Sequence, residues 1–324
     1  MSTPNQGNLP QPQGQQVYPY ADDEIDLKEL FLVLWAGKRL IGGITTLAAV
    51  IAVVVALMMP NIYTSSALLA PAESASGGIG SLMKQYGGLA SLAGISLPGG
   101  GDTSKAQLGI EIIKSRAFVS QFIEQRRLLP DLMAAESWSI DTGELQYDAD
   151  LYDAKASTWV RDVDPPKQPQ PSLQEAHEEF AEILSVSEDK KSGYVTVSIE
   201  HLSPIVAQQW VTWLVQDINT AMRDQDIIEA ERSIEYLNEQ IATTSLADLQ
   251  TMFFELIQSQ TETIMLAKVR PEYVFKTIDP AIVPEEESKP MRALICVLGT
   301  LLGGMLAVLI VLIRHYAFGE KQGA

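Results

Sequence analysis

The stretch "VPEEESKPMRALICVLGTLLGG", from Val283 to Gly304, decides the fold because it joins a proline- and acid-rich run directly to an apolar helix. The apolar part continues beyond it, and Ala293–Ile313 contains 21 residues without a charged side chain. A helix of that length measures about 30 Å, which is the thickness of the hydrocarbon layer of a bilayer. The stretch therefore predicts a membrane span that is approached through a stiff segment.

A second window of this kind, Leu40–Met59, has 20 residues without a charge. It lies far from a short basic n-region and is longer than a typical signal-peptide core, so we interpret it as a retained span rather than a cleaved leader. Arg292, at the outer end of the second span, is the one basic residue against the positive-inside rule. Four others support it and predict that both termini face the cytoplasm: Lys38, Arg39, Arg314 and Lys321.

The long segment between the two spans, Pro60–Pro290, carries 17 Lys and Arg against 35 Asp and Glu, so the whole net charge of -18 lies there. Such a surface makes nucleic acid and anionic lipid headgroups poor partners. The single cysteine, Cys296, lies inside the second span, where an oxidising compartment would find nothing for it to pair with. These features predict a bacterial inner-membrane protein with a large periplasmic domain.

Composition and periodicity divide the chain into six parts. Residues 1–20 are rich in Pro, Gln, Gly and Asn and cannot bury a core, whereas "DEIDLKELFLVLW" (Asp23–Trp35) has apolar residues at helical spacing. The predicted parts are a disordered cytoplasmic tail (1–21), a cytoplasmic amphipathic segment (22–39), a first transmembrane helix (40–59), a periplasmic domain (60–290), a second transmembrane helix (291–313) and a cytoplasmic tail (314–324).

Three stretches of the periplasmic part are predicted to be strands. "NIYTSSALLAP" (Asn61–Pro71) and "EYVFKTIDPA" (Glu272–Ala281) are β-branched, and each lies next to a span in the sequence. "GYVTVSIEHL" (Gly193–Leu202) alternates apolar and polar residues and follows "ILSVSEDKKSG", which predicts a hairpin with its turn at Asp189–Gly193. We expect these strands to form a membrane-proximal mixed sheet.

Helical periodicity marks the rest of the domain, apart from Glu73–Gly101 and Asp162–Pro171, which we leave unassigned. Nothing breaks the helical pattern for 38 residues from Pro204, a residue that suits a first helical turn. The fold class is therefore α+β, with two transmembrane helices flanking a domain that has a long projecting helical arm. The other predicted helices are Ser104 to about Leu129, about Ser172–Leu184, and a return helix at about Leu246–Lys268.

Residues for catalysis or cofactor binding are not grouped in the sequence. The three histidines, His177, His201 and His315, lie far apart, and "GGIGSLM" lacks the last glycine of a dinucleotide-binding loop. Acid pairs such as Glu178/Glu179 or Asp148/Asp150 could serve a glycosidase, but a chain with this many acids forms such pairs by chance. We predict no enzyme activity, no cofactor and no metal site.

Several segments, taken in order, resemble those of Wzz-type polysaccharide chain length determinants, the polysaccharide co-polymerases of the bacterial inner membrane. The resemblance covers nearly all of residues 22–315. The segments that carry it are "DEIDLKELFLVLW", the glycine-rich "GGLASLAGISLPGGG", "EIIKSRAF", "KKSGYVTVSIEHLSP", "YLNEQI", "YVFKTIDPAIVP" and the proline-bounded second span.

The resemblance implies a function and a set of partners. It implies that the chain sets the modal length of a surface polysaccharide, most often lipopolysaccharide O-antigen, which a Wzy-type polymerase makes. It also implies ring-shaped homo-oligomers, contact with lipid-linked polysaccharide, and the branch of the family without a fused cytoplasmic tyrosine-kinase domain.

Two sets of residues are predicted to support the membrane region. Pro280, Pro284 and Pro290 make "DPAIVPEEESKP" a stiff extended connector between sheet and bilayer. Within the second span, glycines four apart allow another helix to approach closely, either the first span of the same protomer or a neighbour's helix. Glycine is also common in membrane helices without such a role. The glycines concerned are Gly299 and Gly303, with Gly304 adjacent.

A charged stripe on the long helix is a candidate oligomer contact. Asp217, Asp224, Glu231 and Asn238 recur every seven residues, and a neighbouring protomer could exchange salt bridges with them. A solvated stripe that faces an aqueous lumen is the alternative. Arg223 and Arg232 lie beside the stripe.

Two other function classes compete with length regulation. A two-span periplasmic ligand sensor or scaffold would need a cytoplasmic signalling domain, whereas only about 39 N-terminal and 11 C-terminal residues are predicted to face inward. A membrane-anchored glycosidase would need the catalytic site that we do not find.

Overall fold

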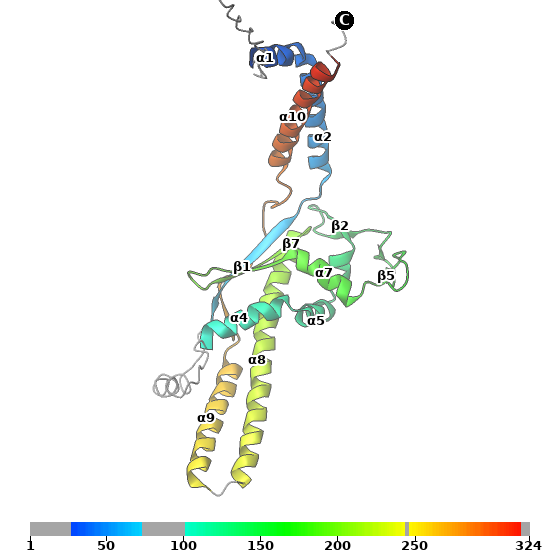
Figure 1. Cartoon of the computed structure of the whole chain (residues 1–324). Coiled ribbons are helices and arrows are strands. Elements are labelled where there is room, and N and C mark those ends of the chain that lie inside the picture. The colour runs from blue at the N-terminus through cyan, green and yellow to red at the C-terminus, as the bar shows by residue number, and fades with distance from the viewer. Residues whose placement is uncertain (1–26, 73–100, 244–245, 319–324) are drawn as a thin grey trace, which may run out of the picture. The chain divides into compact units, whose positions relative to one another are not determined.

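The computed structural model describes residues 27–72, 101–243 and 246–318 (Figure 1). The chain divides into two compact units, one made of residues up to Ala56 together with those from Arg292, and one that spans Leu57–Met291. The predicted disordered tail and nearly all of the glycine-rich stretch 73–101 lie outside the described residues.

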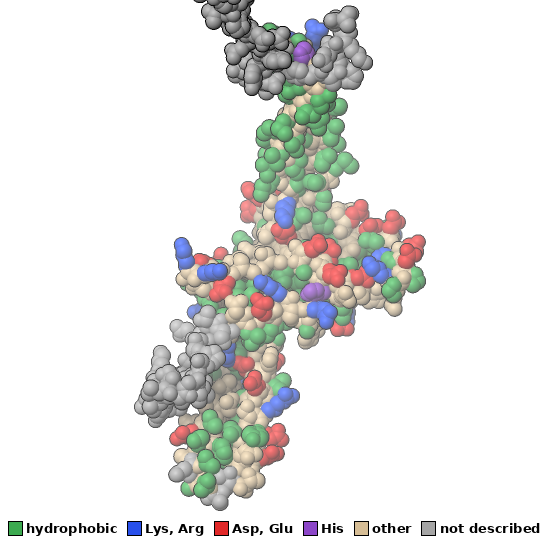
Figure 2. Space-filling view, viewed as in Figure 1, with side chains coloured by type: hydrophobic (Ala, Val, Ile, Leu, Met, Phe, Trp, Pro, Cys, Tyr) green, Lys and Arg blue, Asp and Glu red, His purple; other side chains and the backbone are tan. Residues whose placement is uncertain are grey.

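The first unit contains three helices: α1 (Leu27–Ala36), α2 (Lys38–Met58) and α10 (Arg292–Phe318). Both predicted spans are confirmed as helices, and α2 and α10 are long and apolar enough to cross a membrane by length and composition. Hydrophobic side chains cover the face of these helices that Figure 2 shows, and many apolar side chains of both helices are exposed. Lipid contact explains such exposure, because a helix that is apolar all round has no aqueous face.

Helix α1 is the described part of the predicted amphipathic segment, whose residues before Leu27 lie outside the described chain. Phe31 and Trp35, one turn apart, stack with ring centroids 6.0 Å apart, and both are exposed. The Lys38 ammonium lies 4.5 Å from the centroid of the Trp35 ring. An apolar face beside a cation is typical of a helix that lies at a membrane surface.

The second unit is built on a four-stranded sheet in the order β6-β7-β1-β8. The predicted strands and the hairpin are confirmed, but all three strand pairs are antiparallel, so the prediction of a mixed sheet is wrong. Both neighbours of β1, β7 and β8, run antiparallel to it, and β6 runs antiparallel to β7, so the sheet contains no parallel pair. The strands are β1 (Tyr63–Pro71), β6 (Leu184–Glu188), β7 (Val195–His201) and β8 (Phe275–Asp279).

One face of this sheet is packed against helices. Alternate residues of β7, from Val195 to His201, are buried, as the alternating sequence pattern predicts. Trp210 in the first half of α8 (Pro204–Thr243) is buried and stacks on Phe180 of α7 (Leu173–Ile183) at 5.9 Å. The core of the unit therefore lies between the sheet, α7 and the start of α8.

The prediction of a single continuous helix from Ser104 to about Leu129 is wrong, because this stretch is divided into separate helices. The structure has α4 (Gly101–Lys114), α5 (Arg116–Arg126) and α6 (Leu129–Met133). Ser115 is extended and its hydroxyl accepts the backbone N–H of Phe118, which starts a new helix there. Arg127 has a φ of 56°, in the left-handed region, and ends α5. Two local caps thus override a continuous helical periodicity.

Four short strands form two small hairpins that the sequence analysis does not predict. They are β2 (Ala135–Trp138) paired with β3 (Leu145–Tyr147), and β4 (Tyr152–Asp153) paired with β5 (Thr158–Trp159).

The long arm is confirmed as a helical hairpin. Helix α8 begins at Pro204 as predicted and has 40 residues, a length of about 60 Å. Helix α9 (Ala247–Val269) runs back beside it (Figure 1), close to the predicted 246–268. The buried residues of α8 end at Met222, apart from Ala230, so its outer half is more exposed than its first half.

Candidate interaction surfaces

The two apolar helices of the first unit meet at glycines of α10. A methyl group built on Gly299 would lie 2.6 Å from Cβ of Ala52 in α2, and one built on Gly303 would overlap Cβ of Ala48. Real Cβ atoms do not approach this closely, so both positions require glycine at the present helix separation. Gly304 faces Thr45 with ordinary clearance, since its built methyl group lies 3.7 Å from the hydroxyl oxygen.

Glycines on the other helix of the pair behave differently. Gly42 and Gly43 of α2 are exposed, and methyl groups built there would meet nothing within 4 Å. The close packing is thus confined to the α10 face that carries Gly299 and Gly303. Its partner is the α2 helix of the same chain, which is one of the two alternatives that the sequence leaves open.

The predicted connector, residues 280–290, is tied along the edge of the sheet within the second unit. The backbone N–H of Ile62 donates to the carbonyl oxygen of Lys289 (3.0 Å), and that of Ser288 donates to the carbonyl of Ile62 (2.8 Å). Further along, the hydroxyl of Ser65 donates to the carbonyl of Ile282 (2.7 Å). The connector therefore lies beside the first half of β1, whereas β8 pairs with the second half of that strand.

Side chains reinforce this attachment. The Lys289 ammonium lies 2.6 Å from a carboxylate oxygen of Glu200 in β7, and the Thr64 hydroxyl donates to that of Ser288. Pro280, Pro284 and Pro290 lie at the start, middle and end of this segment. Because proline has no N–H, each interrupts the ladder that a regular edge strand would form.

Part of the predicted oligomer stripe on α8 is engaged within the chain. The guanidinium of Arg126 in α5 donates to both carboxylate oxygens of Asp217, at 2.6 and 3.2 Å, and lies 4.9 Å from the ring of Trp213. The hydrogen bond to Asp217 raises the pKa of Arg126. This pair fastens α5 to α8, so Asp217 is less available for a neighbouring chain.

The outer part of the stripe is more open. Arg223 pairs with its neighbour Asp224 at 3.0 Å, and both reach solvent. Glu231 and Arg232 are exposed and make no ion pair with any residue that the structure describes. Asn238 is exposed as well. The structure thus leaves the part of the stripe from Asp224 outward accessible to a second chain.

A buried asparagine that the sequence analysis missed fixes the base of the arm. Asn219 is 3% exposed, and its carboxamide oxygen accepts the N–H groups of Val274 and Phe275 at 2.8 and 2.9 Å. Its Nδ2 donates to the carbonyl of Phe275 at 3.0 Å and to that of Val215. The sequence contains one sign of this role, since Asn219 is a polar residue in the apolar row of α8, beside Ile218.

A second polar link lies one to two turns further along α8. Asp226 accepts hydrogen bonds from the Lys105 ammonium (2.7 Å) and from the phenol of Tyr273 (2.6 Å). Burial, followed by this hydrogen bond, raises the pKa of Tyr273. Helix α4, helix α8 and the residues before β8 are therefore tied at one carboxylate.

Both histidines of the second unit, His177 and His201, contact backbone groups of the fold. His201 is buried against Trp210, its Nδ1 accepts the N–H of Ser203, and its Nε2 donates to the carbonyl of Asp131. Burial lowers the pKa of His201. His177 lies near the carbonyl of Lys114 at 3.5 Å. Among the described residues, His, Cys, Asp and Glu do not gather into a group that could hold a metal ion.

Comparison with known families links these features to a class of proteins. The model of the Wzz chain length determinant protein matches residues 23–126. A second model, GNVR, described as a G-rich domain on putative tyrosine kinase, matches residues 249–316. The first covers α1, α2, β1, α4 and α5, and the second runs from α9 through β8 and the connector to α10.

Solved structures give weaker similarities. A full-length bacterial polysaccharide co-polymerase shares 15% identity at a TM-score of 0.40, covering 92% of this chain and all of the other. A fragment of WzzB, a polysaccharide co-polymerase from Salmonella Typhimurium, shares 11% identity at a TM-score of 0.29, covering 71% of this chain and all of the fragment. Curated proteins gave no match.

The two family matches include both apolar helices, the first strand and the connector, which are the segments whose order carries the resemblance in the sequence. That resemblance is confirmed: the model of the Wzz chain length determinant protein matches the first part of the chain, and the GNVR model matches the last.

Proposed function

We propose that the chain regulates the modal length of a surface polysaccharide, most often lipopolysaccharide O-antigen, without catalysing a reaction itself. The Wzz match over residues 23–126 is the observation that carries this proposal. The polymer would be made by a Wzy-type polymerase in the same membrane, which receives lipid-linked polysaccharide. A length regulator needs contact with the polymerase or polymer rather than a set of reacting groups.

The proposed location is the bacterial inner membrane, with α2 and α10 as spans, both termini in the cytoplasm and residues 60–290 in the periplasm. The basic residues Lys38, Arg39 and Arg314 support this orientation. Labelling of single cysteines introduced near each terminus, with a reagent that does not cross the membrane, tests the orientation.

The proposed assembly is a ring-shaped homo-oligomer in which the outer part of the α8 stripe contacts a neighbour. Asp224, Glu231 and Arg232 support it, because they are exposed and both signs of charge are present. The proposed role of the connector is to fix the domain relative to the spans. Its hydrogen bonds to Ile62 and Ser65 support that role.

Deletion of the gene tests the function directly. The polysaccharide should still be made, but its length distribution on a gel should lose its preferred length, and the wild-type gene should restore it. An unchanged banding pattern would contradict the proposal and favour a sensor or scaffold. Loss of all polymer would point to an enzyme of the pathway.

A further inference from the structure

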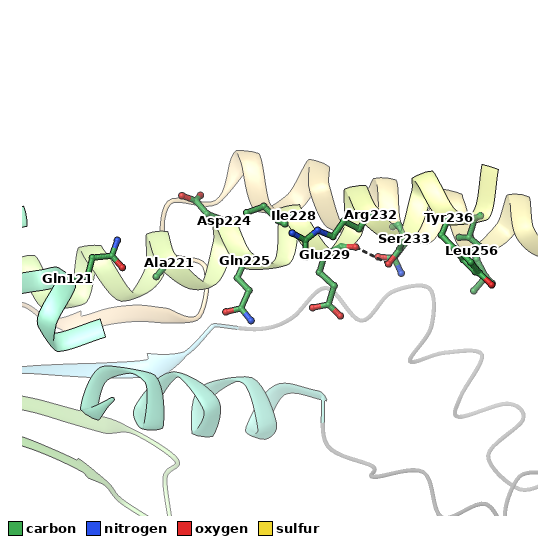
Figure 3. Close-up of a pocket in the computed structure, with 12 residues that line it drawn as sticks. Gln121, Ala221, Asp224, Gln225, Ile228, Glu229, Arg232, Ser233, Tyr236 and Leu256 are labelled. Atoms are coloured by element: carbon green, nitrogen blue, oxygen red, sulfur yellow. Dashed lines mark hydrogen bonds between the residues drawn. The ribbon is translucent and has the colours of Figure 1, made fainter. Parts of the chain in front are cut away.

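The four-stranded sheet of the second unit has two edge strands, β6 and β8. An edge strand presents unpaired backbone N–H and C=O groups, with which a strand of a second copy can pair. Such pairing would compete with the contact between copies that we propose for the arm. The proposed contact is made by side chains of α8, where Asp224 and Arg232 line an open groove of about 890 Å³ (Figure 3).

The backbone groups on the outer edge of β8 can be identified from its pairing with β1. Successive residues of a strand point their N–H and C=O groups alternately to the two sides. The carbonyl of Val274 accepts the N–H of Ala72, the residue that follows β1, at 2.9 Å. Phe275 and Thr277 therefore point away from β1, and a further strand would pair with these two residues.

Side chains already occupy these positions. The carboxamide of Asn219 accepts the N–H of Phe275 at 2.9 Å and donates to its carbonyl at 3.0 Å. The N–H of Thr277 donates to Oε1 of Glu272 at 2.9 Å. Both outward N–H groups of the first half of β8 are thus used, which leaves a second copy without a donor at either residue.

The two side chains differ in what else they do. Asn219 is buried and fixes the base of the arm, as described above. Glu272 is exposed and makes no ion pair with any residue in the described part of the chain. Its bond reaches only five residues along the chain, to Thr277, so it joins no separate elements of the fold. Glu272 can therefore be replaced without removing a core contact.

The other edge strand, β6, has different protection. The N–H of Leu184, where β6 begins, donates to the carbonyl of Phe180 in α7. Charged residues, Glu188 and Asp189, lie at its other end, and charged side chains on an edge disfavour pairing. On β8, by contrast, the side chain of Ile278 is 48% exposed and would favour it. The outer edge of β8 thus depends more on occupied backbone groups.

We propose that the Glu272 carboxylate, together with the Asn219 carboxamide, seals the outer edge of β8 against strand pairing with a second copy. The seal leaves side chains of the helices as the surfaces through which copies meet. The inference goes beyond the proposed function, because it concerns a contact between copies whatever polymer the chain regulates.

Chemical cross-linking of the full-length chain in membranes tests the seal. Ile278→Cys, in a chain that also carries Cys296→Ser, places one thiol on β8, and a short bis-maleimide links two copies only where their β8 strands lie close together. Glu272→Ala removes the acceptor of the Thr277 N–H, whereas Glu272→Gln removes the charge and keeps an acceptor oxygen. Glu285→Ala, at an exposed acid of the connector, is the matched control for charge.

The linked dimer should increase by about tenfold in Glu272→Ala, since each copy then offers a free N–H to the other. It should stay at the starting level in Glu272→Gln and Glu285→Ala. Adding Thr277→Pro to Glu272→Ala should return the dimer to that level, because proline removes the outward N–H and no bond to β1. A unit that Glu272→Ala had merely destabilised would not be restored by proline.

Three results would overturn the inference. One is an unchanged dimer level in Glu272→Ala at normal membrane abundance. Another is an equal increase in Glu272→Gln or Glu285→Ala, which would assign the effect to charge rather than to the hydrogen bond. The third is loss of the Glu272→Ala protein from the membrane while Glu272→Gln stays at normal abundance, which would show that the bond serves folding.

Discussion

Asn219 and Phe275 are joined by two hydrogen bonds, through which a side-chain amide pairs with a strand residue as a neighbouring strand would. The amide donates to the Phe275 carbonyl at 3.0 Å and accepts the Phe275 N–H at 2.9 Å. The second oxygen lone pair accepts the N–H of Val274. The start of β8 is thus held by a helix, which fixes where the arm returns to the sheet.

Replacing Asn219 by Leu should destabilise the second unit by about 3 kcal/mol, because two buried N–H groups lose their acceptor. Denaturant unfolding of the purified protein, followed by tryptophan fluorescence, measures the loss. Asn238→Leu is the matched control, since Asn238 is exposed on the same helix, and it should change stability by less than about 0.5 kcal/mol. Equal effects of the two variants would show that the Asn219 bonds contribute little.

Replacing both Gly299 and Gly303 by Leu should abolish the preferred polysaccharide length while the protein inserts at normal abundance. The new side chains would collide with Ala52 and Ala48, whereas hydropathy and span length are kept. Polysaccharide gels and immunoblots of membranes provide the measurement. A double Leu replacement at Gly42 and Gly43, where built methyl groups meet nothing, should preserve the length distribution. A wild-type distribution in the first variant would show that the α10 glycines are dispensable.

Reversing Asp224 and Glu231 to Lys should shift the ladder of cross-linked oligomers and broaden the polysaccharide lengths. Both residues are exposed, and Glu231 has no ion-pair partner among the described residues. The control reverses Glu255 and Glu262, exposed acids of α9, with the same change in net charge. An unchanged ladder with unchanged lengths would support the alternative of a stripe that faces water.

Stability of the second unit should fall as the pH drops below 6.5, the ordinary pKa of histidine. The folded chain holds His201 neutral with a lowered pKa, so in this range the unfolded chain binds a proton that the folded chain does not. The loss should amount to about 1.4 kcal/mol for each unit by which the pKa is lowered. Denaturant unfolding at pH 7.5 and 5.5 measures it. In His201→Gln the added slope should vanish, and an identical slope in both proteins would contradict the assignment.

The long arm and the main sheet could be predicted because their signals are local and repeated. Alternation in Val195–His201 and the unbroken helical pattern after Pro204 each extend over several residues. The break at Ser115 has no such signal, because a serine can either continue a helix or cap one, and the choice depends on packing around Phe118. Strands of two to four residues, such as β4 and β5, are too short to show a period.

The candidate surfaces were only partly accessible from sequence for the same reason. Spacing identifies Gly299 and Gly303, but which helix they meet depends on tertiary structure. The seven-residue repeat includes Asp217, yet its pairing with Arg126 joins residues 91 positions apart. The role of Asn219 could not be predicted either, because its hydrogen-bond partners, Val274 and Phe275, are distant in the sequence.

The pairing of Ile62 with Lys289 has a mechanical consequence. Three residues separate Ile62 from the end of α2, and two separate Lys289 from the start of α10. The backbone pair therefore joins residues near the start and the end of the second unit, so β1 and the connector cannot separate at this end unless the pair breaks. The Lys289 to Glu200 ion pair attaches the same point to β7.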